Sequence, residues 1–103
     1  MKPVLIISTY PNKKSILKIS NELVKTKIIA CVNILKIDSV YSWNGKIQNS
    51  GEYIAIFKTV KKNKTKLKKK ITETHPYDVL EIVEIDVTSI NKSYLNWLIE
   101  STN

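Results

Sequence analysis

The sequence predicts a single α+β domain in which two helices alternate with four strands, the middle two joined as a long hairpin. Two observations lead to this prediction. An Asn44-Gly45 pair lies between long arms rich in Val, Ile, Tyr and Phe, which is typical of a β-hairpin with a type I′ turn. Apolar residues recur at helical spacing in the segments on either side of this hairpin. A length of 103 residues suits one domain, residues 1–103, with its own core.

The hairpin is predicted to span residues 30–60. If Asn44 and Gly45 form the turn, Trp43 faces Lys46 and Cys31 falls near Lys58. A β-bulge within residues 49–51 would shift the lower pairs by one position.

The arms of this hairpin are long for a small domain. Residues 30–41 alone would extend roughly 40 Å at about 3.3 Å each, whereas a domain of this length has a radius of gyration of about 13 Å. The arms should therefore overhang, carrying Tyr41, Trp43 and Tyr53, and lie against another subunit. The alternative is a hairpin that bends near Asp38 and Gly51 and is covered by its own helices.

Four further elements complete the chain. Residues 4–7 form a short apolar run, typical of a buried strand, and residues 13–27 form an amphipathic helix. Residues 61–74 form a second helix that ends before Pro76, and residues 79–87 form a fourth strand. Tyr94, Trp97 and Leu98 suit a short C-terminal helix.

The resulting order is strand, helix, strand, strand, helix, strand. With hairpin-joined middle strands and right-handed crossovers, this order predicts a ferredoxin-like split βαβ arrangement with an antiparallel sheet. The first and third strands should be central and the second and fourth should form the edges.

The charge of the chain is uneven. Residues 1–72 hold sixteen of the seventeen lysines but only three of the nine acidic residues. Such asymmetry raises the hypothesis of nucleic-acid binding. All basic residues are lysine, however, and none is arginine, the residue that binds phosphate and guanine through two parallel hydrogen bonds. We therefore expect no nucleic-acid partner and interpret the lysines of residues 61–74 as a solvated face, with an anion-attracting surface as the alternative.

The sequence predicts a cytoplasmic protein. Only four apolar residues follow Met1-Lys2-Pro3, so no signal peptide is expected, and no apolar run has the roughly 20 residues that a membrane span needs. The single cysteine excludes an internal disulfide and suits a reducing compartment.

Few residues suit covalent chemistry. Cys31 and His75 could form a nucleophile and base only if the fold brought them together, and no phosphate-binding glycine loop or hydrolase motif is present. We therefore expect no enzymatic activity. A cysteine on a strand more often serves as a small core residue.

Carboxylates on the fourth strand are a second candidate feature. Glu81 shares one face with Val79, Val83 and Ile85, so, if buried, it needs a lysine, a tyrosine hydroxyl or a ligand beside it. The alternative is a solvated strand end. Glu84 and Asp86 lie on the other face, as ordinary edge charges or as weak ligands for a divalent ion.

Several segments together resemble a known family, the CutA divalent-cation tolerance proteins. They are residues 30–34 (ACVNI), 39–47 (SVYSWNGKI), Glu52, Lys58-Thr59, 75–78 (HPYD), Glu81 and 94–98 (YLNWL). Their order and spacing match the family over nearly the whole chain. The resemblance implies a ferredoxin-like subunit in a homotrimer similar to the PII signalling proteins, with hairpins that cross onto neighbouring subunits. It also implies a role in tolerance of copper and other divalent metals.

The resemblance extends to candidate site residues. Cys31, Asn33, Lys58, Tyr77 and Glu81 match family positions and are expected to line a ligand-binding cleft between subunits. His75 is the expected metal ligand.

Three positions depart from the family pattern. Ser8 and Thr74 replace a cysteine and a histidine found in members that bind copper, and Leu80 replaces a proline. Only His75 of the metal-binding pattern remains, so we expect weak divalent-metal binding, with copper as the candidate ion and carboxylates such as Glu81 as further ligands.

Together with this resemblance, the sequence leads us to expect a cytoplasmic protein, and the resemblance implies a homotrimer with intersubunit clefts for a metal ion or small ligand. One alternative is a PII-like regulatory module that senses an anionic metabolite through Lys58 and neighbouring lysines. Others are an enzyme using Cys31 and His75, and a scaffold for protein contacts.

Overall fold

The computed structural model describes residues 1–103 and has the predicted α+β, ferredoxin-like fold. The elements in chain order are β1 (Pro3–Tyr10), α1 (Lys13–Lys25), β2 (Cys31–Trp43), β3 (Lys46–Val60), the 3₁₀ turn η1 (Lys61–Asn63), α2 (Lys64–Thr74), β4 (Val83–Asp86) and α3 (Lys92–Glu100). The antiparallel sheet has the order β2-β3-β1-β4. The first and third strands are therefore central, as predicted.

The hairpin has the predicted register along its whole length. Cys31 pairs with Lys58 and Trp43 with Lys46, without a shift at residues 49–51, so no bulge forms there. Asn44 and Gly45 both have positive φ, 52° and 74°, as a type I′ turn requires.

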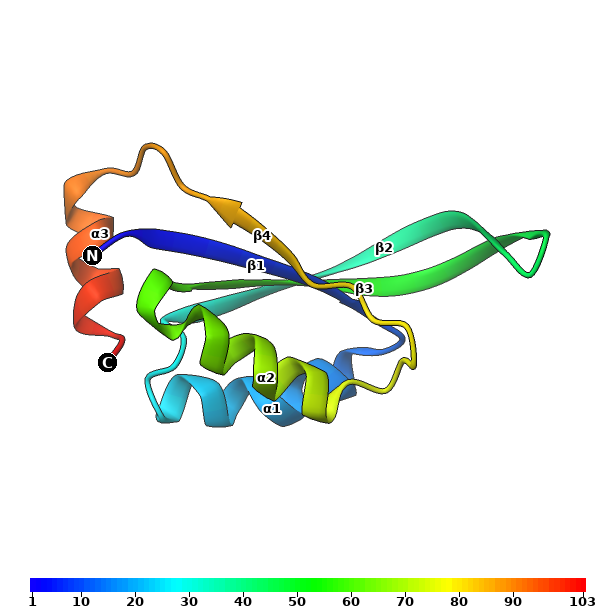
Figure 1. Cartoon of the computed structure of the whole chain (residues 1–103), viewed down its shortest axis with the longest axis horizontal. Coiled ribbons are helices and arrows are strands. Elements are labelled where there is room, and N and C mark those ends of the chain that lie inside the picture. The colour runs from blue at the N-terminus through cyan, green and yellow to red at the C-terminus, as the bar shows by residue number, and fades with distance from the viewer.

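The outer half of the hairpin extends beyond both long helices (Figure 1). The molecule measures 45 × 26 × 21 Å, with a radius of gyration of 14.5 Å against about 13 Å for a compact domain of this length. Val40, Tyr41, Trp43 and Ile47 near the tip are 43–69% exposed. The alternative of a bent hairpin covered by its own helices is therefore wrong.

The core lies on one face of the sheet, which α1 and α2 cover (Figure 1). Side chains alternate along β1, so that every second one, from Val4 to Tyr10, is buried beneath the helices. Each helix contributes one apolar stripe: Ile16, Ile19 and Leu23 from α1, and Leu67 and Ile71 from α2. A smaller cluster around Leu98 docks α3 at one end of the sheet.

The fourth strand is shorter than predicted. Only residues Val83–Asp86 pair with β1, whereas residues 79–82 leave the sheet. The reason lies on β1: the Thr9 carbonyl accepts a hydrogen bond from His75, and the Thr9 hydroxyl donates to Glu81. Side chains thus occupy the edge of β1 where a longer β4 would have paired.

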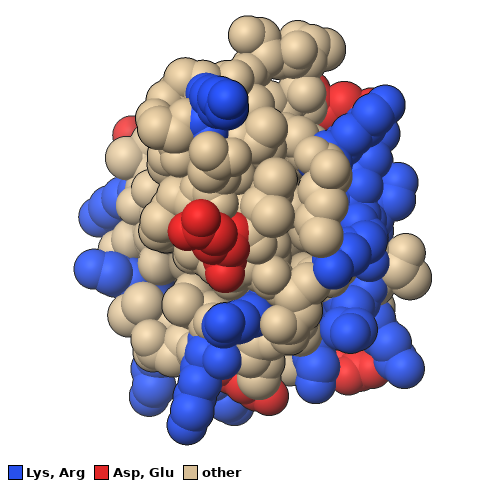
Figure 2. Space-filling view, turned by 90° about the vertical axis from the view of Figure 1, so that its left-hand side faces the viewer, with Lys and Arg blue, Asp and Glu red and all other residues tan.

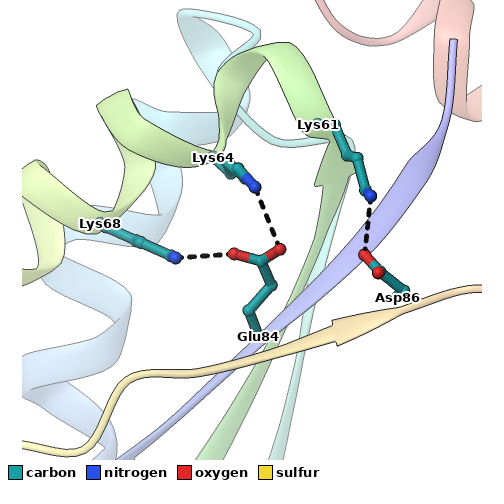
Figure 3. Close-up of polar contacts among 5 residues, drawn as sticks. All are labelled: Lys61, Lys64, Lys68, Glu84 and Asp86. Carbon is teal, nitrogen blue, oxygen red and sulfur yellow. Dashed lines mark hydrogen bonds and ion pairs between the residues drawn. The ribbon is translucent and has the colours of Figure 1, made fainter.

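Lysines of η1 and α2 fix this short strand to the helical layer (Figure 3). Glu84 lies between Lys64 and Lys68, with N–O distances of 3.2 and 2.7 Å, and Lys61 pairs with Asp86 at 3.1 Å. The hydrogen bonds from Lys68 and Lys64 lower the pKa of Glu84. The two carboxylates are therefore structural partners of lysines.

Other lysines point into solvent, in agreement with the solvated-face interpretation of residues 61–74. Lys62, Lys66 and Lys69 are exposed. Seen from the end that carries α3, lysine side chains form a band along the right-hand edge of the molecule (Figure 2). None of the helices combines the length and the hydrophobicity that a membrane-spanning helix requires.

Candidate functional site

The sheet face opposite α1 and α2 has an apolar centre. Leu5 and Ile7 of β1 pair with neighbours on β3 and β4, and the register places Ile56, Val83 and Ile85 beside them. Val83 and Ile85 are 41% and 42% exposed, although a strand face of this composition is normally covered. We call this surface, which also includes Leu35 and Ile54, the open face.

Cys31, Asn33 and Lys58 lie together at one end of the open face. Lys58 stands directly opposite Cys31, and the Cys31 thiol contacts the Asn33 side-chain oxygen at 3.9 Å. The Lys58 ammonium reaches α3 instead, with its Nζ 3.4 Å from the Tyr94 hydroxyl and 5.5 Å from the ring centroid. These three predicted site residues therefore form one group.

His75 lies at the other end of β1. Its Nε2 is 2.9 Å from the Thr9 carbonyl oxygen, and its Nδ1 accepts the Tyr77 backbone N–H at 3.0 Å. Because Nδ1 is an acceptor, the proton of the neutral ring must be on Nε2, which donates to Thr9. The ring stacks on Tyr10 at 4.2 Å, and burial lowers the pKa of His75. A metal ion could bind this ring only by displacing one of these two hydrogen bonds.

Tyr77 and Glu52 form a short hydrogen bond near His75. The Tyr77 hydroxyl donates to Glu52 Oε2 at 2.7 Å, and Glu52 is only 9% exposed. Burial, together with the neighbouring carboxylate, raises the pKa of Tyr77. Tyr77 therefore remains a hydrogen-bond donor at neutral pH and holds the carboxylate in place.

Glu81 differs from one of its two sequence-based interpretations. It is exposed and lies outside β4, and it accepts a hydrogen bond from the Thr9 hydroxyl at 3.2 Å. The interpretation as a buried strand carboxylate is wrong, although the side chain does have a fixed neighbour. Its exposed position agrees with the alternative interpretation, a carboxylate at the solvated end of the strand.

A cavity of about 540 Å³ opens between the overhanging part of the hairpin, residues 39–43 and 52, and residues 77–81. Its walls include three aromatic side chains and three carboxylates: Tyr41, Trp43, Tyr77, Glu52, Asp78 and Glu81. We call it the hairpin cavity. Two of the predicted site residues, Tyr77 and Glu81, line it, whereas Cys31, Asn33, Lys58 and His75 do not.

Within one subunit the predicted residues thus form two separate groups. Cys31 pairs with Lys58 on β3, and Lys58 pairs in turn with Leu5 near the start of β1. His75 instead contacts Thr9 and Tyr10 at the end of β1. Cys31 and His75 cannot meet as nucleophile and base in one chain. No three His, Cys, Asp or Glu side chains converge closely enough to hold one metal ion.

At the two positions that depart from the copper-binding pattern, one hydroxyl is buried in the core and the other is already engaged in a hydrogen bond. Ser8 is fully buried in the core, and the Thr74 hydroxyl donates to the Lys70 carbonyl oxygen at 2.7 Å. Neither side chain forms a hydrogen bond with the His75 ring, whose partners are Thr9 and Tyr77.

Sequence reasoning missed Glu52 and Thr9 as site residues. Glu52 appears only among the residues that carry the family resemblance. It is, however, an isolated carboxylate on an apolar arm, opposite Ile37 in the hairpin register, and this isolated charge could have identified it as a candidate site residue. Thr9 carried no signal, because its role depends on the loop that leaves the sheet.

A second hollow, of about 650 Å³, lies near the start of β1 and the segment after β4. Two of its three charged residues, Lys61 and Asp86, pair with each other at 3.1 Å. It contains none of the predicted site residues.

The comparisons with known proteins agree with this architecture. The family model described as CutA1 divalent ion tolerance protein matches residues 4–101. The divalent-cation tolerance protein CutA of Pyrococcus horikoshii is 41% identical over 99 residues, covering 96% of this chain and 97% of its own length. The chloroplastic protein CutA of Arabidopsis thaliana is 37% identical over 100 residues, which are 96% of this chain and 55% of that protein.

A solved structure shows the same fold. The divalent ion tolerance protein CutA1 of Ehrlichia chaffeensis superposes with a TM-score of 0.93 at 37% identity, covering 100% of this chain and 98% of that one. The match spans all three helices, the hairpin and the loop that carries Tyr77. The chain therefore belongs to the CutA1 divalent ion tolerance protein family.

Proposed function

We propose that this protein is a cytoplasmic homotrimer that acts in tolerance of divalent cations, copper among them, through clefts between its subunits that bind a metal ion or small ligand. The family match over residues 4–101 and the name of the Pyrococcus relative support the role in cation tolerance. The observation that carries the proposed assembly is the open face.

An uncovered apolar face is a strong reason for assembly. Leu35, Val83 and Ile85 are 61%, 41% and 42% exposed in the isolated chain, and exposed apolar patches of this kind usually mark an interface. The overhanging hairpin adds Tyr41 and Trp43 to the surface that a neighbour would cover. A closed ring of three copies would bury these residues without leaving a free edge.

Such an assembly also supplies a reason for the two separate groups of site residues. The group of Cys31, Asn33 and Lys58 flanks one end of the open face, and the group of Tyr77 and Glu81 flanks the other. Head-to-tail contacts between subunits would bring unlike ends together. The cleft then takes one group from each of two subunits.

Metal binding in this cleft is expected to be weak, in the micromolar range or worse. His75 is the only imidazole, and both of its nitrogens are engaged within the subunit. Carboxylates such as Glu81 supply hard oxygen ligands, which bind copper less tightly than several converging nitrogen or sulfur ligands would. The protein's role in tolerance is then the binding of a ligand rather than catalysis.

One specific observation favours the second candidate, a PII-like module that senses an anionic metabolite. The partly buried Lys58 ammonium has no carboxylate partner and contacts only Tyr94. An anionic group in the cleft would complete its contacts.

Titration calorimetry with Cu²⁺ and Zn²⁺ tests the metal proposal. The parent should bind each ion with micromolar or weaker affinity, and His75→Ala should weaken binding further. Nanomolar binding that survives His75→Ala would show that other ligands hold the metal.

Lys58→Met serves as the matched variant for the second candidate function. It should leave the affinity for metal ions unchanged but abolish binding of a small carboxylate such as citrate.

A further inference from the structure

The walls of the hairpin cavity contrast with the composition of the chain. The protein carries seventeen lysines and nine acidic residues, yet no lysine and three acids line this cavity. The chain as a whole has a net charge of +8. The cavity is therefore a local negative site on a basic protein.

The three carboxylates are also free of lysine partners. Glu84 and Asp86 pair with lysines of η1 and α2, but Glu52, Asp78 and Glu81 form no ion pair. The three carboxylates of the cavity therefore concentrate negative charge that no lysine of the same chain pairs with.

Two of these carboxylates are held by neutral donors. Tyr77 donates to Oε2 of Glu52 at 2.7 Å, and Thr9 donates to Oε1 of Glu81 at 3.2 Å. Because burial raises the pKa of Tyr77, the tyrosine keeps its proton and leaves the negative charge on Glu52 uncompensated. The second oxygen of each carboxylate remains available to another donor.

The remaining walls are aromatic. Tyr41 and Trp43 come from the overhanging part of β2, and Tyr77 comes from the loop before β4. The faces of such rings attract cations, most strongly for tryptophan. Aromatic rings together with carboxylates are the groups that recognise ammonium ions in proteins.

Size and spacing distinguish between kinds of cation. The carboxylates do not converge into a group that could hold one metal ion. A volume of about 540 Å³ lies within the roughly 300–1,000 Å³ range of small-molecule sites. Spaced carboxylates and aromatic walls suit an ammonium group on an alkyl chain better than a bare ion.

We propose that the hairpin cavity binds an alkylammonium group, held by Glu52 and Glu81 and covered by the rings of Tyr41 and Trp43. This inference deepens the proposed function, because it names the ligand class for the end of the cleft that carries Tyr77 and Glu81. The ammonium has two sources: a free amine, or the lysine side chain of a second copy of this chain.

Calorimetric titration of the assembled protein with 1,4-diaminobutane tests the free-amine source, with Trp43 fluorescence as a second readout. The diamine should bind saturably, and the uncharged, equally long 1,4-butanediol should not. Glu81→Gln and Glu52→Gln keep the hydrogen-bond acceptors but remove charge, and each should weaken binding at least about tenfold. Glu22→Gln, on the exposed surface of α1, is the control and should bind as the parent does.

Carbodiimide coupling tests the lysine source on the same samples. An isopeptide bond between the carboxylate of Glu52 or Glu81 and a lysine Nζ of another chain would support the proposal even if the diamine does not bind. Mass spectrometry would detect this bond, which should be absent from the glutamine variants. Failure of both experiments, or equal binding of the diol, would overturn it. Sedimentation of the same samples, together with the metal titration, reports separately on the proposed function, so the two proposals can fail independently.

Discussion

Tyr77 links the loop before β4 to the hairpin through a single hydrogen bond. Its hydroxyl lies 2.7 Å from Oε2 of the nearly buried Glu52. Neither residue type alone predicts this contact, since it joins residues twenty-five positions apart whose distance depends on the whole fold. A hydrogen bond to a buried charged group contributes more than an exposed neutral one.

Tyr77→Phe should therefore reduce the free energy of unfolding by about 1–3 kcal/mol, because it leaves Glu52 without its donor. Urea denaturation at fixed protein concentration measures this change. Tyr41→Phe is the matched control, since the Tyr41 hydroxyl accepts only a 3.4 Å contact from Ser50, and it should cost less than about 0.5 kcal/mol. Equal effects of the two variants would refute the special role of Tyr77.

His75 should make stability depend on pH in the mildly acidic range. Burial lowers its pKa from 6.5, so the unfolded chain binds a proton more readily than the folded one. The stability that His75 contributes is complete above pH 6.5 and is lost as the pH falls from 6.5 toward the lowered pKa of the folded state.

Urea midpoints measured between pH 7.5 and 5 test this dependence. His75→Phe keeps an aromatic ring to stack on Tyr10 but cannot bind a proton, so its midpoint should fall less than that of the parent over this range. Parallel curves for the two proteins would mean that His75 does not titrate differently in the folded state.

Individual side chains were the least predictable part of the site. Glu81 could be assigned to one strand face only if the strand continued through it, and that strand begins at Val83. His75 could be recognised as the one candidate imidazole, but its hydrogen bonds to Thr9 and Tyr77 were not visible in the sequence. A side chain's partners depend on long-range geometry, whereas its chemical type does not.

At the scale of elements, the hairpin was the most predictable feature. Its turn is encoded locally, because Asn44 and Gly45 tolerate the positive φ that a type I′ turn needs. The turn then sets the register of every pair down to Cys31 and Lys58. β4 was less predictable, because its length is decided by side chains bound to the edge of β1.

The turn permits a direct comparison of the chain's two glycines. No atom lies within 4 Å of a Cβ added at Gly45 or Gly51, but only Gly45 has a positive φ, +74°. Gly45→Ala should reduce stability by about 1 kcal/mol through backbone strain alone. Gly51→Ala, within β3, should be neutral or slightly stabilising, because alanine loses less backbone freedom on folding. Urea denaturation of both variants checks this, and an equal loss would contradict the turn-based account of register.

At the scale of the whole molecule, the sequence predicted the strand order, the two covering helices and the overhang. These features follow from hydrophobic periodicity and element length, which are properties of long segments. The arrangement of the hairpin cavity could not be predicted in this way, since it depends on where the loop after α2 passes the hairpin.

The exposed apolar residues of the open face predict that the protein assembles through this surface. Leu35 lies on this face and is 61% exposed in the single chain, whereas Leu17 on the outer side of α1 is 41% exposed. If the open face is the interface, Leu35→Lys should weaken assembly by placing a charge in it, and Leu17→Lys should not.

Sedimentation equilibrium of the parent protein over a wide dilution range tests this claim most directly. The account predicts a mass of about 35 kDa, three times the 11.8 kDa of one chain, that persists to low micromolar concentration. A folded species of 11.8 kDa at those concentrations would contradict it, because the open face would then be stable in water without a partner.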